Sequence, residues 1–156
     1  MIAAAPPVTP CTLPLAAHYS VSGQRHQQVL IATGHARHSS YTTVTRWVYR
    51  NDCWTKVSST PARNGARGWH PKPWDYSYYS PIGRFGLTDA GGQLPAPTGT
   101  RLPYDHDRRG FAAPSPHVFD YVVAINFNRV AGRSPLDLKR PDPRIHDGGI
   151  WLHVSG

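Results

Sequence analysis

Alternating apolar and polar side chains in the first third of the chain predict β-strands. Over Tyr41–Arg50 the aromatic residues fall on one face of a period-two pattern, and the valines and arginines fall on the other. The apolar segment Gln28–Ala32 precedes this stretch across the loop His35–Ser40, and Cys53–Val57 follows the turn-forming pair Asn51-Asp52. Because strands joined by short connections usually pair, these three segments predict an antiparallel three-stranded meander.

The strongest strand pattern lies in the last third of the chain. Residues 121–128 alternate between an apolar, aromatic face and a second face that ends in two asparagines. In the short segment Ile150–Val154, Trp151 and His153 fall on the face opposite the aliphatic residues. We therefore expect a strand over Ile150–Val154 that pairs beside Tyr121–Asn128. This strand directs the His153 imidazole away from the aliphatic face, into a cleft or into solvent.

The remaining segments predict loops and one further strand. Gly, Pro and polar residues dominate Ser58–Ser80, Ala90–Pro103 and Ala131–Asp147, whereas Ser80–Leu87 leads from a turn into a strand. No window shows the apolar repeat of an amphipathic helix, and residues 1–10 form an Ala/Pro-rich leader that we expect to be disordered. With 156 residues, 39% of them hydrophobic, the chain can bury one core. These features predict a mainly β fold with a single domain over residues 11–156, built as a mixed sheet or sandwich with long Gly/Pro-rich loops.

The chain is strongly basic, with 17 Lys and Arg against 9 Asp and Glu and a net charge of +8. Such a charge favours an anionic partner, such as nucleic acid, acidic lipid or the anionic polymers of a cell wall. The basic residues are scattered and form no tract, so a solvated basic surface is the simpler explanation and no nucleic-acid partner is predicted. No segment is apolar enough to span a membrane, and the start of the chain, Met1–Pro7, lacks the features of a signal peptide.

Candidate chemistry is sparse. Among nine histidines only His35 and His38 have the spacing of a ligand pair, and no second pair completes a site, so neither a metal ion nor another cofactor is predicted. No phosphate-binding glycine loop, zinc-protease motif or serine-hydrolase motif is present. The two cysteines, Cys11 and Cys53, are not spaced as metal ligands. They form either one disulfide of an exported domain or two unlinked thiols.

Several short motifs, taken in order, make the chain resemble a known family. They are Cys11–Leu15, Trp47–Trp54, Ser80–Phe85, Gly99–Tyr104, Asp120–Asn128 and Gly149–His153. In order and spacing they are similar to the secreted branch of the L,D-transpeptidases, which carry the YkuD-type catalytic domain, along nearly all of residues 11–156. The resemblance implies the mainly β fold of that domain, a secreted or cell-wall location, a monomer, and a disulfide between Cys11 and Cys53.

Enzymes of this family are cysteine acyltransferases that cross-link the stem peptides of peptidoglycan. The resemblance makes His153 the general base, and the backbone carbonyl of Val154 the group that orients its second ring nitrogen. The nucleophilic cysteine should follow in a Gly-Cys turn, but the sequence ends at Gly156, and neither Cys11 nor Cys53 matches the nucleophile's place. We therefore expect a domain that is C-terminally incomplete and inactive alone. Its expected partners are peptidoglycan stem peptides, with anionic wall polymers as further candidates.

A function of a different class is also open. A small, basic, non-catalytic protein that binds the cell wall or a polysaccharide could keep this scaffold and use Trp69, Trp74 and Tyr76–Tyr79 as a stacking surface. The same aromatic residues could instead hold a long loop over a sheet.

The segment Asp105–Phe119 is shorter than its counterpart in L,D-transpeptidases, so the substrate contacts of that region should differ from those of the family.

Overall fold

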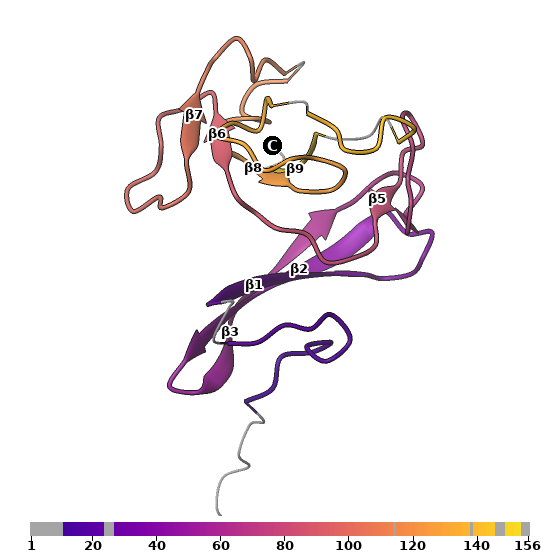
Figure 1. Cartoon of the computed structure of the whole chain (residues 1–156), viewed down its shortest axis with the longest axis vertical. Helices are drawn as coiled ribbons and strands as arrows, with labels where there is room; N and C mark the ends of the chain where they lie inside the picture. Colours follow the sequence, from indigo (N-terminus) through magenta and orange to yellow (C-terminus); the bar gives the residue numbers. More distant parts are fainter. Residues whose placement is uncertain (1–10, 24–26, 114, 138, 146–148, 154–156) are drawn as a thin grey trace, which may run out of the picture. The chain divides into compact units, whose positions relative to one another are not determined.

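The computed structural model describes residues 11–23, 27–113, 115–137, 139–145 and 149–153 (Figure 1). These residues form nine β-strands and no helix, so the prediction of a mainly β fold is confirmed. The chain divides into two compact units: unit 1 is Met1–Trp69 and unit 2 is His70–Gly156. The short strand β4 (Trp69–His70) lies where the units meet in the sequence, and it pairs with β5 (Ser80–Pro81). The leader 1–10 lies outside the described residues.

Unit 1 is the predicted meander of three antiparallel strands, in the order β1 (Gln28–Gly34), β2 (Tyr41–Arg50) and β3 (Cys53–Arg63). Asn51 and Asp52 connect β2 to β3 with positive φ angles of 50° and 57°, the left-handed conformation that Asn and Asp adopt in tight hairpin turns. The prediction that the third strand stops at Val57 was wrong. It continues to Arg63 because the whole of β2 offers hydrogen-bonding partners, so that Tyr41 pairs with Arg63.

A disulfide joins Cys11, the first described residue, to Cys53 at the start of β3. Cys11 and Cys53 are bonded across 42 positions of sequence, with a Cα–Cα distance of 4.5 Å, and the Trp54 amide donates a hydrogen bond to the Cys11 carbonyl. Leu13 and Trp54 are buried beside this link. The predicted disulfide is therefore confirmed, and the alternative of two unlinked thiols was wrong.

Unit 2 is built on a mixed four-stranded sheet in the order β7-β6-β8-β9 (Figure 1). The strands are β6 (Ala90–Gly92), β7 (Tyr104–His106), β8 (Val122–Ile125) and β9 (Ile150–His153). β6 and β7 are parallel, whereas β8 is antiparallel to both β6 and β9. The predicted pairing of the two last strands is confirmed, although β8 is shorter than the predicted Tyr121–Asn128. The predicted end of the last strand, Val154, lies outside the described residues.

Two predictions for unit 2 were wrong. Ala90–Pro103 was expected to be a loop, but its first three residues form β6, which lies inside the sheet and is fully buried. Ser80–Leu87 was expected to continue into a strand, but only Ser80–Pro81 does so. The sequence Ala-Gly-Gly of β6 has no β-branched or alternating side chains, so it carries no strand signal. It forms a strand because its small residues fit between β7 and β8.

Close packing on β6 explains why small residues are needed there. A Cβ atom added to Gly91 would lie 2.6 Å from Cζ of Phe111 and 2.6 Å from the Asp105 carbonyl oxygen. The ring of Phe111 is completely buried, and Val122, the cross-strand partner of Gly91, is buried with it. The absence of a side chain at Gly91 therefore makes room for the fully buried ring of Phe111.

Unit 2 contains a buried ion pair between Asp89 and Arg129. The Arg129 guanidinium donates two hydrogen bonds to the Asp89 carboxylate, at 2.8 and 2.5 Å, and both side chains are inaccessible to solvent. Arg129 also donates to the carbonyls of Ser134 and Asp137 and to Oδ1 of Asn126. The Thr88 hydroxyl donates to Oδ1 of Asp89, the oxygen that also accepts from Nη1 of Arg129. The charges are thus paired and their hydrogen-bonding groups satisfied, which is the condition for burying them.

Candidate functional site

His153 lies at the end of β9, where its residue pairs with Val122 of β8. It is exposed, and it shares a face of the strand with Trp151, opposite Ile150 and Leu152, as the alternation predicts. Aromatic rings continue along this face. Trp151 packs 5.5 Å from Phe111 and 5.2 Å from Phe119, and Phe119 in turn meets the imidazole of His153 edge to face at 5.1 Å. The imidazole therefore ends an aromatic row at the solvent-exposed edge of the core.

The geometry around His153 suits a group that transfers protons. The contact with Phe119 restricts the rotation of the ring, and exposure leaves the imidazole accessible. The carbonyl of Val154, expected to orient the ring, lies outside the described residues. The chain has two cysteines, and both are bonded to each other in unit 1. Neither Cys11 nor Cys53 can therefore supply a thiolate to His153.

A second histidine pairs with a carboxylate in the loop that leads into β8. His117 Nδ1 lies 2.9 Å from Asp120 Oδ2, and Phe119, the residue that touches His153, lies between them in sequence. The pair borders an open cavity of about 310 Å³ that also includes Gln93, Leu94 and Arg108. This pair is not among the site residues predicted from the sequence. Its only sequence signal is the spacing of a histidine and an aspartate three residues apart.

The backbone holds this loop against β6. The amides of Gln93 and Leu94 donate to the carbonyls of Phe119 and Asp120, at 2.9 and 3.3 Å. An imidazole whose Nδ1 faces a carboxylate keeps its Nε2 directed outward, as in sites of proton transfer. The site thus has two imidazoles. His153 of β9 contacts Phe119, and His117 lies two residues before Phe119 in the loop.

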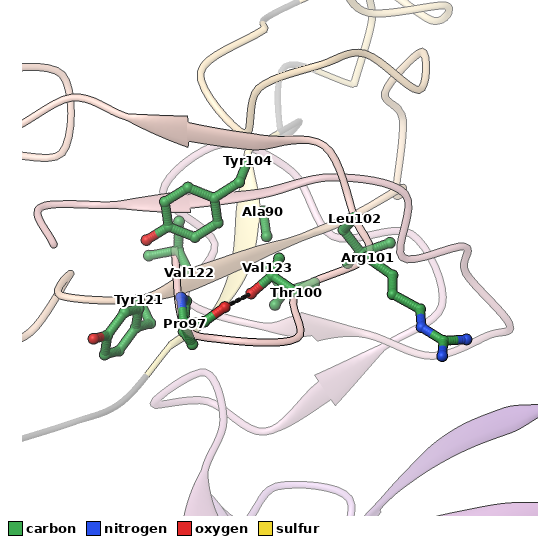
Figure 2. A pocket seen from close by; sticks show the side chains of 9 residues that line it. All are labelled: Ala90, Pro97, Thr100, Arg101, Leu102, Tyr104, Tyr121, Val122 and Val123. Carbon is green, nitrogen blue, oxygen red and sulfur yellow. Dashed lines mark hydrogen bonds between the residues drawn. The ribbon is translucent and has the colours of Figure 1, made fainter. Parts of the chain in front are cut away.

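A third feature is a mainly apolar pocket of about 250 Å³ on the four-stranded sheet (Figure 2). Ala90, Leu102 and Val123 line it, and Figure 2 shows Tyr104 and Tyr121 at one end and Arg101 at the other. The Tyr104 hydroxyl donates to the Leu94 carbonyl at 2.8 Å. Burial raises the pKa of Tyr104, and the neighbouring Tyr121 and Asp120 raise it further, so this hydroxyl keeps its proton. The pocket can accept an apolar group, but it holds no reactive side chain.

The aromatic residues proposed as a stacking surface divide between the two units. Trp69 belongs to unit 1 and packs over Gly34, where an added Cβ would lie 2.2 Å from the indole nitrogen. In unit 2, by contrast, Trp74, Tyr76 and Tyr78 are exposed to 49%, 88% and 66%. Three of the described rings also pack together: His70 lies 5.4 Å from both Trp74 and Tyr79, and Trp74 lies 6.0 Å from Tyr79. We call His70, Trp74, Tyr76, Tyr78 and Tyr79 the aromatic cluster.

His35 and His38 do not form a metal site in the described part of the chain. No group of three His, Cys, Asp or Glu residues suited to a metal ion occurs among the described residues. Nε2 of His35 lies 3.3 Å from the Thr43 hydroxyl, and its ring stacks on Tyr41. Within those same residues there is no helix of the length and apolarity needed to cross a membrane.

The chain matches no protein-family model, no curated protein and no solved structure. The similarity to L,D-transpeptidases therefore rests on the short motifs in the sequence.

Proposed function

We propose that this chain is a peptidoglycan-directed domain of the L,D-transpeptidase type in which His153 acts as the base for a thiol. The observation that carries the proposal is the position of His153. The motif residues Ile150–His153 form a strand whose imidazole leaves the aliphatic face and ends in solvent beside Phe119. A base of this kind must be accessible to a reacting group and restrained in its orientation.

The role of His153 in this chemistry is proton transfer. The imidazole accepts the proton of a cysteine thiol, the thiolate attacks the carbonyl of the stem peptide, and the imidazolium returns the proton to the leaving D-alanine amine. The thiol must come from a cysteine other than Cys11 and Cys53, since these two are joined in the disulfide. The 156-residue chain should therefore bind stem peptides without turning them over. The disulfide is compatible with an extracellular location.

Binding of a synthetic tetrapeptide stem to the ¹⁵N-labelled chain tests the proposal. We expect the indole N–H of Trp151 and the amides of Val122 and His153 to shift, because these groups surround the imidazole. The variant His153→Ala should weaken the shift at Trp151 while leaving the spectrum of β1–β3 unchanged. Unchanged spectra at saturating peptide would contradict the proposal.

Incubation with muropeptides, analysed by mass spectrometry, tests the expectation that the chain has no nucleophilic thiolate and therefore no turnover. No D-alanine should be released and no cross-linked dimer formed, because the chain holds no free cysteine. If product appears, and is lost in Cys11→Ser or Cys53→Ser, the nucleophile has been assigned wrongly.

A further inference from the structure

The backbone conformation of the aromatic cluster in unit 2 leaves two tyrosine rings exposed to solvent. Tyr76 and Tyr78 have φ angles of +57° and +59°, in the left-handed region that bulky residues rarely occupy. The residue between them, Ser77, is buried, and its hydroxyl accepts hydrogen bonds from the amides of Trp74 and Tyr79, at 3.3 and 3.5 Å. The unfavourable conformation at the two tyrosines is thus held by a buried serine, while both tyrosine rings remain in solvent.

Strained backbone that is held by its surroundings commonly marks a functional site. A loop that only covers a sheet would turn its rings inward, but Tyr76 is 88% exposed and Trp74 and Tyr78 are about half to two-thirds exposed. Pro73 and Ser77, by contrast, are fully buried. The small residues anchor the turn and the large rings face outward, which is the reverse of ordinary packing.

The charges beside the aromatic cluster are largely paired. Arg140 lies 4.0 Å from Asp75, the residue between Trp74 and Tyr76, and Arg144 forms a bidentate pair with Asp142. The charge of Lys72 makes a further, smaller contribution to lowering the pKa of Asp142. A surface that binds single-stranded nucleic acid needs cations directed at phosphates beside its rings. Here Arg140 and Arg144 already face carboxylates, which favours an uncharged ligand.

The rims of the rings carry hydrogen-bonding groups. Tyr76 and Tyr78 each have a hydroxyl, and Trp74 has an indole N–H. The Lys72 amide donates to Nδ1 of His70 at 3.0 Å, so Nε2 of this imidazole carries the proton and can donate. Flat apolar faces edged with polar groups match a pyranose ring, which has C–H faces and hydroxyl edges.

We propose that the aromatic cluster is a binding site for an uncharged pyranose glycan, stacked on Trp74, Tyr76 and Tyr78. This site is separate from His153 and does not rest on the proposed transpeptidase chemistry. In binding to a cell wall it would contact the sugar strand, whereas His153 would face the peptide.

Titration calorimetry with a hexamer of N-acetylglucosamine, and with cellohexaose, tests the site on the full chain. Binding of either glycan supports the proposal, and comparing the two shows whether the acetamido group contributes. Because stacking depends weakly on ionic strength, the affinity should be unchanged between low salt and about 0.5 M salt. Absence of binding to both glycans would overturn the proposal. So would preferential binding of an oligothymidylate that weakens steeply with salt.

Variants separate binding from folding. Tyr76→Gly and Tyr78→Gly remove a ring but suit the positive φ angle, so each should weaken glycan binding about tenfold without lowering thermal stability. Trp74→Ala should have at least as large an effect, and Tyr76→Phe should keep most of the affinity. The matched control is Tyr41→Ala, which removes a ring that is 52% exposed in unit 1. His153→Ala should also bind glycan normally. Full affinity in Tyr76→Gly, Tyr78→Gly and Trp74→Ala would refute the site.

Discussion

Unit 1 has strands of seven to eleven residues and few buried side chains, whereas the sheet of unit 2 has strands of three or four residues around a buried core. Most of β3 is exposed, and a disulfide links its first residue to Cys11. In unit 2, Phe111, Val122 and Ala124 are almost inaccessible. Unit 1 therefore has the longer strands, whereas unit 2 has more of the buried side chains. Strand length alone is a poor guide to where stability resides.

The largest expected effect comes from the buried ion pair of unit 2. Asp89→Asn removes the negative charge and leaves the Arg129 guanidinium buried without a counter-charge, so unit 2 should lose about 3–5 kcal/mol of unfolding free energy. Amide hydrogen exchange read by mass spectrometry would resolve β6–β9 from β1–β3. The exposed pair Arg144 and Asp142 supplies the control, since Arg144→Ala should change exchange very little. Equal effects in the two variants would contradict the contrast between core and surface.

The disulfide should have the next largest effect, confined to unit 1. Replacing both cysteines in Cys11→Ser/Cys53→Ser removes a link across 42 positions and should cost roughly 3–4 kcal/mol in the chain-entropy account. The same exchange experiment should show faster exchange in β1–β3 and unchanged exchange in β8 and β9. If β8 and β9 lose protection to the same degree, the two units do not have separate sources of stability.

A smaller loss is expected at the centre of the sheet. Gly91→Ala places a Cβ 2.6 Å from both the Phe111 ring and a backbone oxygen, so the strand must shift, at a cost of about 1–3 kcal/mol. Adding Phe111→Leu should restore part of this loss, because the smaller side chain relieves one of the two contacts. Denaturant titrations of the single and double variants measure the coupling. Strictly additive losses would show that the ring is not the obstacle.

The smallest effect concerns acid stability. Hydrogen bonds from the Arg144 side chain, followed by its backbone amide, lower the pKa of Asp142 from 3.8 to about 2. A carboxylate with a depressed pKa stabilises the fold above its unfolded pKa, and this contribution is lost as the pH falls towards 2. Asp142→Asn should therefore flatten the dependence of stability on pH between about 4 and 2. A pH dependence identical to that of the parent chain would mean that Asp142 is equally ionised in the unfolded state.

The parts that the sequence predicts are those whose signal is local. Alternation along Tyr41–Arg50 and Ile150–His153 is visible in consecutive residues, and so the meander and the position of His153 opposite the aliphatic residues followed from it. β6 could not be predicted because it needs small residues rather than a strand-forming pattern. That need comes from the ring of Phe111, which packs on Gly91 but is remote from it in sequence.

The candidate sites show the same limit. Asp89 and Arg129 are 40 residues apart, so only the folded chain brings them together. The contact between Phe119 and His153 and the pairing of His117 with Asp120 depend on how one loop packs beside β8 and β9. For the aromatic cluster, composition indicated the residues, but it could not separate Trp69, which is packed on Gly34, from Trp74, which is exposed.

The pairing pattern also determines the order in which the chain can fold. Unit 1 forms from neighbouring segments through short connections, whereas the sheet of unit 2 must join Ala90 to Val123 and Ile125 to Ile150. Closing long loops slows folding, so the meander should form first. Synthesis runs in the same direction, because Cys11 and Cys53 leave the ribosome before β8 and β9 exist. The crosslink can thus close on a finished N-terminal sheet while the residues around His153 are still being made.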